Sequence, residues 1–340
     1  MKHLDPSRLS RREFLGQAAA VAAAAGLPAS AGAAKQSESS EVLKLAERVP
    51  TRTRPPAEAR VVIVRDARVQ DAAGRTNAQV LRKMLERALL TLSGAKTVAE
   101  AWRKYFRKDD FVAMKYNELG GMALTTSPPL RFMVSEALRT HVGVGAGKVV
   151  PIGRCTRYRG AYRGWGDEQT IHTCGFKTRF GAVFDKHATA IVNLPVVKTH
   201  QSAGVTCALK IHVGSVKNSF MFCGDEDWPR LWKNLPELNS LPTIRRKQRL
   251  VIADALRPLY DKGPTDSPPH RFRYGGLIVS TDPVAVDAAA TRIINDARRR
   301  KRRPPLTWPG RMLALAEALG VGLADPAKTK VIEIDLQKDA

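Results

Sequence analysis

The residue types best suited to chemistry follow an apolar run in the middle of the chain. Residues 191–197 are almost wholly apolar, and the chain then reads Lys198-Thr199-His200 before a segment of small residues that carries Thr206 and Lys210. Ammonium groups bind carboxylates and phosphates, and an imidazole can transfer a proton near neutral pH. The pattern predicts a site for an anionic small molecule or cofactor, with Lys198 and His200 as catalytic candidates and Thr206 and Lys210 as ligand-binding residues.

Three other apolar runs also end in polar residues. Lys115 and Asn117 follow one such run, Asp254 follows a second and Asp282 follows a third. Ligands of open α/β sheets bind beyond the carboxyl ends of the strands, so we expect these side chains to meet the first group there. Asp254 is the third catalytic candidate, and Lys115, Asn117 and Asp282 join the ligand-binding set. Asp282 has a second interpretation, because an Asp before Pro283 is also a typical helix N-cap.

The histidines and cysteines give only a weak metal signal. His200 and His212 are the candidate metal ligands, but no metal-ligand spacing includes them, and a strand-end or core position explains each as well. The closest pair among the four cysteines is 223 − 207 = 16 residues apart, so the chain lacks an iron–sulfur cysteine motif. A disulfide between Cys155 and Cys174 is compatible with an oxidising compartment. The sequence names no cofactor.

Alternating strand and helix patterns must position these residues. Seven short apolar runs are typical of strands covered on both faces: 61–65, 111–116, 148–152, 190–197, 250–254, 277–280 and 331–334. Helical periodicity falls between them, at 77–92, 97–106, 130–139, from 282 onward and at 312–319. The alternation predicts an α/β fold with a largely parallel sheet and helices on both faces. Residues 155–188 and 219–245 fit neither pattern and are expected to be long loop insertions.

The N-terminus has the pattern of an export signal. Arg11-Arg12-Glu13-Phe14-Leu15 is followed by a weakly apolar, alanine-rich stretch and then by small residues, as in twin-arginine signal peptides. An alanine-rich helix of the mature protein is the other interpretation. We expect a signal peptide over residues 1–33, a polar linker over 34–58 and an α/β domain over 59–340. The expected partner during export is the twin-arginine translocase, and the expected location is periplasmic or otherwise extracytoplasmic.

The charge balance is strongly basic. The chain has 340 residues, of which 56 are Lys or Arg and 32 are Asp or Glu, so its formal net charge is +24. A hydrophobic content of 44% provides for a core and excludes a disordered polybasic tail. The export signal argues against nucleic acid as a partner. The run of six basic residues at 298–303 either ends a helix, where cations are favourable, or makes peripheral contact with an anionic membrane surface.

These residues resemble a known family. The resemblance is to domain-of-unknown-function family 362 of bacteria and archaea, and it spans about residues 60 to 297. It rests on Lys115-Tyr116-Asn117, Asn193-Leu194-Pro195-Val196-Val197-Lys198-Thr199-His200, Gly204-Val205-Thr206, Lys210 with Gly214, Asp254 with Gly263-Pro264, and Thr281-Asp282-Pro283-Val284-Ala285-Val286-Asp287. The resemblance implies a shared site and export by the twin-arginine route. Some members carry a ferredoxin-like cysteine cluster, which this chain lacks, and the family supplies no assigned reaction.

Together these patterns predict an exported α/β protein of uncharacterised activity. It would bind an anionic small molecule or cofactor at a strand-end site of Lys, His and Asp residues, and the residues do not decide between binding and catalysis. The alternative is a non-catalytic, basic envelope protein that binds anionic surfaces.

Overall fold

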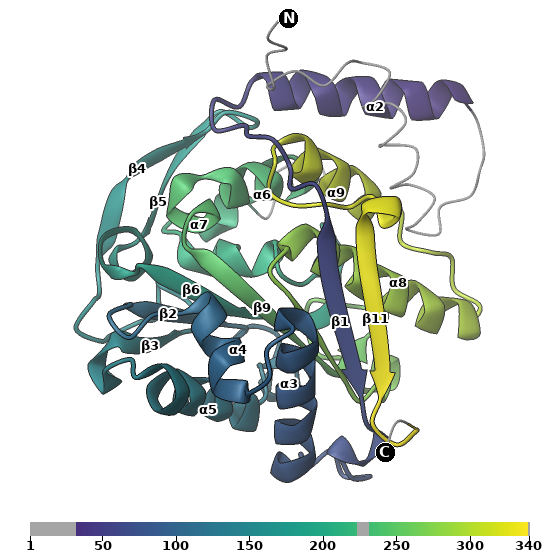
Figure 1. Ribbon diagram of the computed structural model, residues 1–340. Coiled ribbons are helices and arrows are strands. Elements are labelled where there is room, and N and C mark those ends of the chain that lie inside the picture. Colours follow the sequence, from purple (N-terminus) through teal and green to yellow (C-terminus); the bar gives the residue numbers. More distant parts are fainter. Residues whose placement is uncertain (1–31, 223–230, 339–340) are drawn as a thin grey trace, which may run out of the picture.

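One mixed sheet, covered by helices on both faces, organises the molecule. The computed structural model describes residues 32–222 and 231–338 (Figure 1). The nine-stranded sheet has the order β11-β1-β10-β9-β6-β2-β3, with β7 paired to β9 and β8 paired to β7. Five of its eight pairings are parallel: β1 with β11, β2 with β3, β2 with β6, β6 with β9, and β7 with β9. The predicted α/β class with a largely parallel sheet is confirmed.

All seven predicted strands are present in this sheet. Their bounds, with those of the added strand β8, are β1 (Ala59–Arg65), β2 (Val112–Tyr116), β3 (Val149–Ile152), β6 (Ala190–Leu194), β7 (Val196–His200), β8 (Gly204–Thr206), β9 (Gln248–Leu259), β10 (Gly276–Ser280) and β11 (Thr329–Asp335). The run 190–197, expected as one strand, is two. Pro195 has no N–H to donate, and the pairing shifts there from β6 to β7. This break directs Lys198 and His200 along β7, beyond the end of β6.

Helices cover the two faces unequally. One face carries α3 (Ala78–Ser93), α4 (Val98–Tyr105) and α5 (Pro128–Ala137), whose apolar side chains form one core with the sheet. The other face carries α6 (Leu231–Ser240), α8 (Pro283–Arg300) and α9 (Trp308–Ala318), with the short α7 (Pro242–Arg245) beside them. Helix α8 begins at the N-cap Asp282, as its sequence predicts.

One strand runs against both of its neighbours at the centre of the sheet. Strand β10 is antiparallel to both β9 and β1. Its carboxyl end therefore lies at the opposite edge from the carboxyl ends of β2, β3, β7 and β9. The expectation that all the polar strand ends meet at one edge is wrong for β10 and hence for Asp282.

The segment expected as a polar linker is partly helical. Helix α2 (Gly32–Glu47) covers much of residues 34–58 and packs against α9. Val42, Leu45 and Ala46 are buried in the core, and their spacing of three and four residues places them on one helical face. Because this stretch is short and mostly polar, the helical spacing of its few apolar residues was not recognised from the sequence. The predicted signal peptide falls almost wholly on residues 1–31, which lie outside the described residues.

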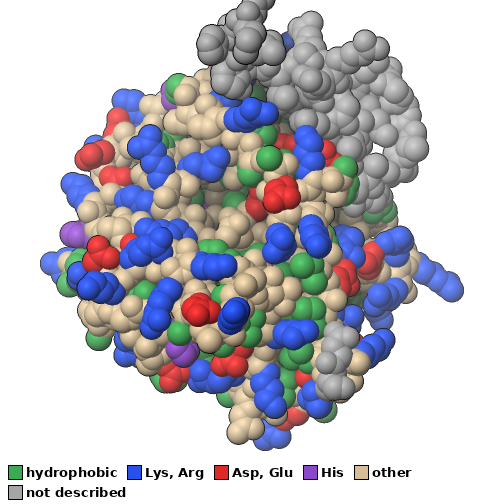
Figure 2. Space-filling model, viewed as in Figure 1, with side chains coloured by type: hydrophobic (Ala, Val, Ile, Leu, Met, Phe, Trp, Pro, Cys, Tyr) green, Lys and Arg blue, Asp and Glu red, His purple; other side chains and the backbone are tan. Residues whose placement is uncertain are grey.

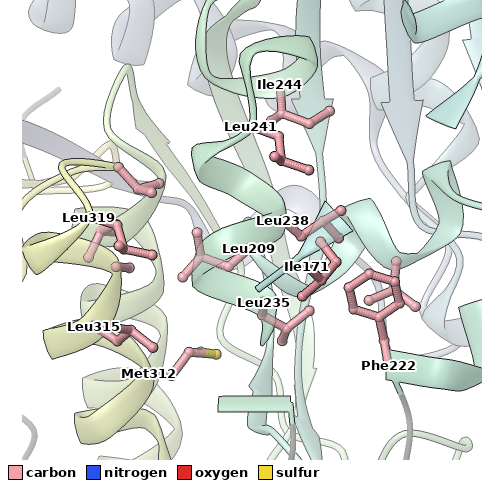
Figure 3. Close-up of a cluster of buried hydrophobic side chains, with 14 of the residues drawn as sticks. Ile171, Leu209, Phe222, Leu235, Leu238, Leu241, Ile244, Met312, Leu315 and Leu319 are labelled. Atoms are coloured by element: carbon pink, nitrogen blue, oxygen red, sulfur yellow. The ribbon is translucent and has the colours of Figure 1, made fainter. Parts of the chain in front are cut away.

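The two segments expected as loop insertions contain regular structure. Residues 155–188 include the antiparallel pair β4 (Trp165–Ile171) and β5 (Phe176–Gly181), which form a separate two-stranded sheet. Residues 219–245 include α6, nearly all of which is buried. Figure 3 shows Leu235 and Leu238 of α6 with Leu209 and side chains of α9 in one apolar cluster. The expectation of loops is therefore wrong for parts of these stretches, because the pairing of β4 with β5 and the burial of α6 against α9 outweigh their Pro, Gly and charged residues.

The surface carries its basic charge in a dispersed form. Lys and Arg side chains are spread over the face shown in Figure 2, with Asp and Glu among them. Within the described ranges, no helix combines the length and apolar character needed to cross a membrane.

Candidate functional site

A cavity of about 260 Å³ lies at the carboxyl ends of the parallel strands β2, β3 and β7. Six of the residues predicted from the sequence line it: Lys115, Asn117, Lys198, His200, Thr206 and Lys210. Arg154 and Glu118 are also in its wall. The structure therefore brings together residues from four separated stretches of chain, at the edge where α/β sheets bind ligands.

Lys115 is a buried lysine held by backbone oxygens. Its side chain is 2% exposed, and Nζ donates hydrogen bonds to the Tyr116 carbonyl at 2.9 Å and to the Gly153 carbonyl at 2.5 Å. Burial lowers the pKa of Lys115 from its ordinary value of 10.5 to about 7. Gly214 permits this packing, because a Cβ there would stand 3.2 Å from Nζ.

Lys198 has the same arrangement on β7. Its side chain is 1% exposed, and Nζ donates to the Leu119 carbonyl at 2.5 Å and to the Pro264 carbonyl at 3.2 Å. Burial, with the nearby charge of Lys210, lowers its pKa to about 8. Asp266 is close enough to favour the charged form, but its carboxylate is paired with Arg271.

Neither lysine has an ion pair with a carboxylate among the described residues. A buried charge without a counterion is strongly disfavoured, and carbonyl oxygens compensate for only part of the lost hydration. Two such ammonium groups in the wall of one cavity leave a local excess of positive charge that an anion in the cavity would neutralise.

The depressed lysine pKa gives a prediction for stability. Between pH 7 and 10.5 the unfolded chain holds the Lys115 proton and the folded chain has lost it, so rising pH stabilises the fold. The expected contribution is up to about 1.4 kcal/mol per pH unit in the free energy of unfolding. Urea unfolding of wild type and of Lys115→Met, at pH 7 and pH 9, measures it. The wild type should gain stability relative to the variant over this range, and equal pH slopes would refute the prediction.

His200 is oriented by a hydrogen bond at one of its ring nitrogens. Its Nδ1 accepts the Ser202 backbone N–H at 3.1 Å, so Nε2 carries the ring hydrogen of the neutral imidazole. Burial, with the charges of Lys210 and Lys198, lowers its pKa to about 3. This arrangement fits donation from Nε2 to a ligand in the cavity. The roles of general base and metal ligand stay predictions.

His212, the second metal candidate, is a core residue. It is fully buried, with Nε2 2.7 Å from Gln248 Oε1, Nδ1 3.3 Å from Ser215 Oγ, and its ring edge-on to Phe184. The described residues contain no cluster of three His, Cys, Asp or Glu side chains able to hold a metal ion. Cys155 and Cys174 are not joined by a disulfide in the structure.

Two buried polar atoms in the cavity wall lack a partner within the part of the chain that the structure describes. They are Thr206 Oγ1 and Arg154 Nε. Buried polar groups in proteins are nearly always hydrogen-bonded. Both residues therefore have unused capacity to bind a polar ligand at the cavity.

The Asn117 side chain donates to backbone carbonyls of the loop that follows β2, and it has no amide hydrogen left for a ligand. Both hydrogens of its amide are used, on the Leu119 carbonyl at 3.0 Å and the Leu124 carbonyl at 2.5 Å. The Leu119 carbonyl also accepts Lys198 Nζ, so Asn117 positions the oxygen that holds this lysine. Its expected role in direct ligand binding becomes one of positioning.

Asp254 does not line the cavity, and its carboxylate instead connects two backbone segments. Its carboxylate accepts the backbone N–H of Ser127 at 2.9 Å and of Leu256 at 3.1 Å, which ties β9 to the start of α5. Burial raises its pKa. Both carboxylate oxygens face backbone donors within the fold, and the catalytic role of Asp254 stays a prediction.

Asp282 lies in a second depression at the opposite edge of the sheet, with Arg60 and Lys330 nearby. Its carboxylate accepts the N–H groups of Val284 and Ala285, at 2.9 Å each, and of Leu323 at 2.8 Å. The helix-cap interpretation accounts for Asp282 fully, and its expected role in ligand binding at the cavity is wrong.

Asp287, the last residue of the run 281–287 that carries the family resemblance, is a positioning residue. It is fully buried on α8, and its carboxylate accepts the N–H of Ala208 at 2.6 Å and of Leu209 at 3.2 Å. Burial raises its pKa to about 7. These bonds, with Leu209 in the core, fix the segment between Thr206 and Lys210 (Figure 3). Its position one turn after the cap of α8 was compatible with either solvent or the interior.

Asp287→Asn is expected to lower the free energy of unfolding by about 2 kcal/mol, because an amide has one acceptor oxygen where the carboxylate has two. Urea unfolding measures the loss, and amide hydrogen exchange at Ala208 and Leu209 should accelerate. Asp296→Asn on the same helix is the matched control, since its pair with Arg299 is exposed. Equal effects of the two substitutions would contradict this assignment.

An apolar side completes the cavity. Ile211, Val213 and Val216 line it together with Phe220, which is 68% exposed. A ligand in this cavity would meet cations and donors on one side and hydrocarbon on the other.

The basic run 298–303 lies at the end of α8, and none of its residues lines the cavity. Arg298 is buried and bonded to the Tyr260 carbonyl and to Asp261, and Arg303 is also near Asp261. Arg299 pairs with Asp296, while Arg300 is exposed. About half of the run is thus engaged within the fold.

Comparisons with known proteins identify part of the chain. Residues 167–292 match the model of the family described as Domain of unknown function (DUF362), a narrower span than the resemblance over 60 to 297. A crystal structure of a protein from Thermotoga maritima, determined by the Northeast Structural Genomics Consortium, is 12% identical and matches over 87% of this chain, with a TM-score of 0.32. The chain spans 61% of that protein, and at this TM-score the likeness supports no statement about fold or function. No curated protein matches the chain. The predicted family is confirmed: the chain contains a DUF362 domain over residues 167–292.

Proposed function

We propose that the chain binds a small anion, carrying a carboxylate, phosphate or sulfate group, in the cavity at the ends of β2, β3 and β7. The observation that carries the proposal is the pair of buried lysines, Lys115 and Lys198, whose only partners within the described chain are backbone carbonyls. The donor His200 and the unpartnered Arg154 Nε and Thr206 Oγ1 support it. Export by the twin-arginine route is part of the same proposal and is supported by the sequence of the N-terminus alone.

Calorimetric titration with sulfate tests this function. Sulfate is suitable because its charge does not change between pH 6 and 9. We expect saturable binding of one sulfate per chain at pH 7, which survives moderate chloride.

A surface variant separates the cavity from general basic charge. Arg300→Ser with Lys301→Ser removes two exposed cations and leaves the cavity intact. The variant should bind sulfate as the wild type does. Loss of binding in this variant, or its absence in the wild type, would favour the alternative of a basic protein that contacts anionic surfaces.

A further inference from the structure

We infer that Lys198 is a nucleophile that forms an imine with the carbonyl group of an anionic keto compound, the simplest of which are 2-oxo acids. The inference rests on the anion binding proposed above and names the class of compound that the site would take.

The stereochemistry of Lys198 Nζ suits this reaction. A neutral amine has two N–H bonds and one lone pair in a tetrahedral arrangement. Two acceptors are present, the carbonyls of Leu119 and Pro264, and both residues belong to the cavity wall. When both hydrogens point at these oxygens, the lone pair takes the remaining direction. Since the pKa of this amine is lowered to about 8, about a tenth of the molecules hold it in the neutral form at pH 7.

The neighbours of Lys198 supply donors for a carbonyl oxygen. His200 is two residues along β7, so its side chain lies on the same side of the strand. Thr206 is the residue directly opposite Lys198 in the β7–β8 pair. The Nε2–H of His200 and the unpartnered hydroxyl of Thr206 therefore flank the amine. A hydrogen bond from either group would polarise a bound carbonyl toward attack.

Lys115 has similar carbonyl partners, but the side chains around it differ from those around Lys198. The charged or titratable groups that act on it are Cys155, Glu118, Lys210 and Arg154. The nearby His212 uses both ring nitrogens within the core. Among the described residues, the neutral donor beside Lys115 is the weak S–H of Cys155, and no imidazole N–H flanks this lysine as His200 flanks Lys198. We assign Lys115 and Arg154 to the acidic group of the compound and Lys198 to its carbonyl carbon.

Imine formation between Lys198 and the keto compound needs no oxidant or reductant. The Lys198 lone pair forms a C–N bond to the carbonyl carbon, and one amine hydrogen moves to the oxygen, which gives a carbinolamine. The C–O bond then breaks, and hydroxide leaves with the second amine hydrogen as water. The products are the imine and one water molecule.

Reductive trapping tests the assignment. The full chain is incubated with pyruvate or phenylpyruvate, reduced with sodium borohydride and digested, and the labelled lysine is located by mass spectrometry. We expect one borohydride-dependent adduct, on Lys198, which excess sulfate suppresses. Acetone, which lacks the anionic group, should label Lys198 at least about tenfold less at equal concentration.

Variants give the complementary test. Lys198→Arg keeps the positive charge but is not nucleophilic, so it should lose the adduct and still bind sulfate. Lys115→Arg is the matched control and should keep an adduct on Lys198. Because the wild-type map locates the adduct directly, the result does not depend on the folding of either variant.

The possible failures are distinguishable. Label on Lys115, or label spread evenly over surface lysines, would overturn the assignment of Lys198. Sulfate binding without any adduct would overturn the imine and leave the anion site standing. Absence of sulfate binding would overturn the proposed function itself.

Discussion

Lys198→Met is expected to weaken sulfate binding by about tenfold to a hundredfold. A hydrogen bond between an ammonium group and an anion contributes about 1.5–3 kcal/mol, which corresponds to a factor of about ten to somewhat more than a hundred in affinity. Lys198 Nζ is buried at the cavity wall and already fixed by two carbonyls, so the anion orders no flexible side chain when it binds. Calorimetric titration of both proteins at pH 7 measures the effect.

Lys148→Met is the control for this substitution. Lys148 is exposed, near the start of β3 and outside the cavity wall, so its loss changes the net charge equally. It should leave the affinity within about twofold of wild type, since exposed charges at a distance are screened by salt. Similar losses in both variants would mean that net charge, and not the cavity, holds the anion.

A rise in pH from 6 to 9 is expected to weaken sulfate binding by about a hundredfold or more. The anion binds the protonated lysines, and the free protein loses these protons at about pH 7 for Lys115 and about pH 8 for Lys198. Above each pKa, the affinity falls by up to tenfold per pH unit for each lysine, because binding must then be accompanied by proton uptake. The direction is fixed by the lowered pKa: binding is strongest below pH 7.

The pH profile has an internal control. Lys115→Met should bind more weakly at pH 6 and show a shallower fall, which begins near pH 8, because only Lys198 then titrates. A flat profile for the wild type between pH 6 and 9 would show that the lysines do not exchange protons with binding.

The sequence predicts the strands well because burial on both faces requires continuous apolar runs. It does not predict strand direction. Nothing in residues 276–280 distinguishes a parallel from an antiparallel neighbour, and the reversal of β10 is what removes Asp282 from the site. Helix α6 was not predicted for another reason. Its apolar residues are interrupted by Asn234, Pro236 and Glu237, so the sequence shows no clear helical period. The packing of its leucines in Figure 3 explains why this segment is nevertheless a buried helix.

For the candidate site, too, the sequence predicts one part and only the structure shows the other. The spacing of Lys115, Lys198 and Lys210 relative to strand ends was enough to predict that they share one cavity. Roles depend on hydrogen bonds that spacing does not encode. Asp254 and Asp287 are both buried carboxylates, and the structure alone shows that each one holds backbone N–H groups. For His200, the single bond from the Ser202 N–H makes the ring a donor.

The number of protons taken up when sulfate binds at pH 8 tests the central claim most directly. It follows from calorimetric titrations in buffers with different enthalpies of ionisation. At this pH free Lys115 is largely neutral and Lys198 is about half neutral, so binding should take up about 1.4 protons per chain. Sulfate binding with no proton uptake would contradict the account, because the charge that holds the anion would then lie elsewhere.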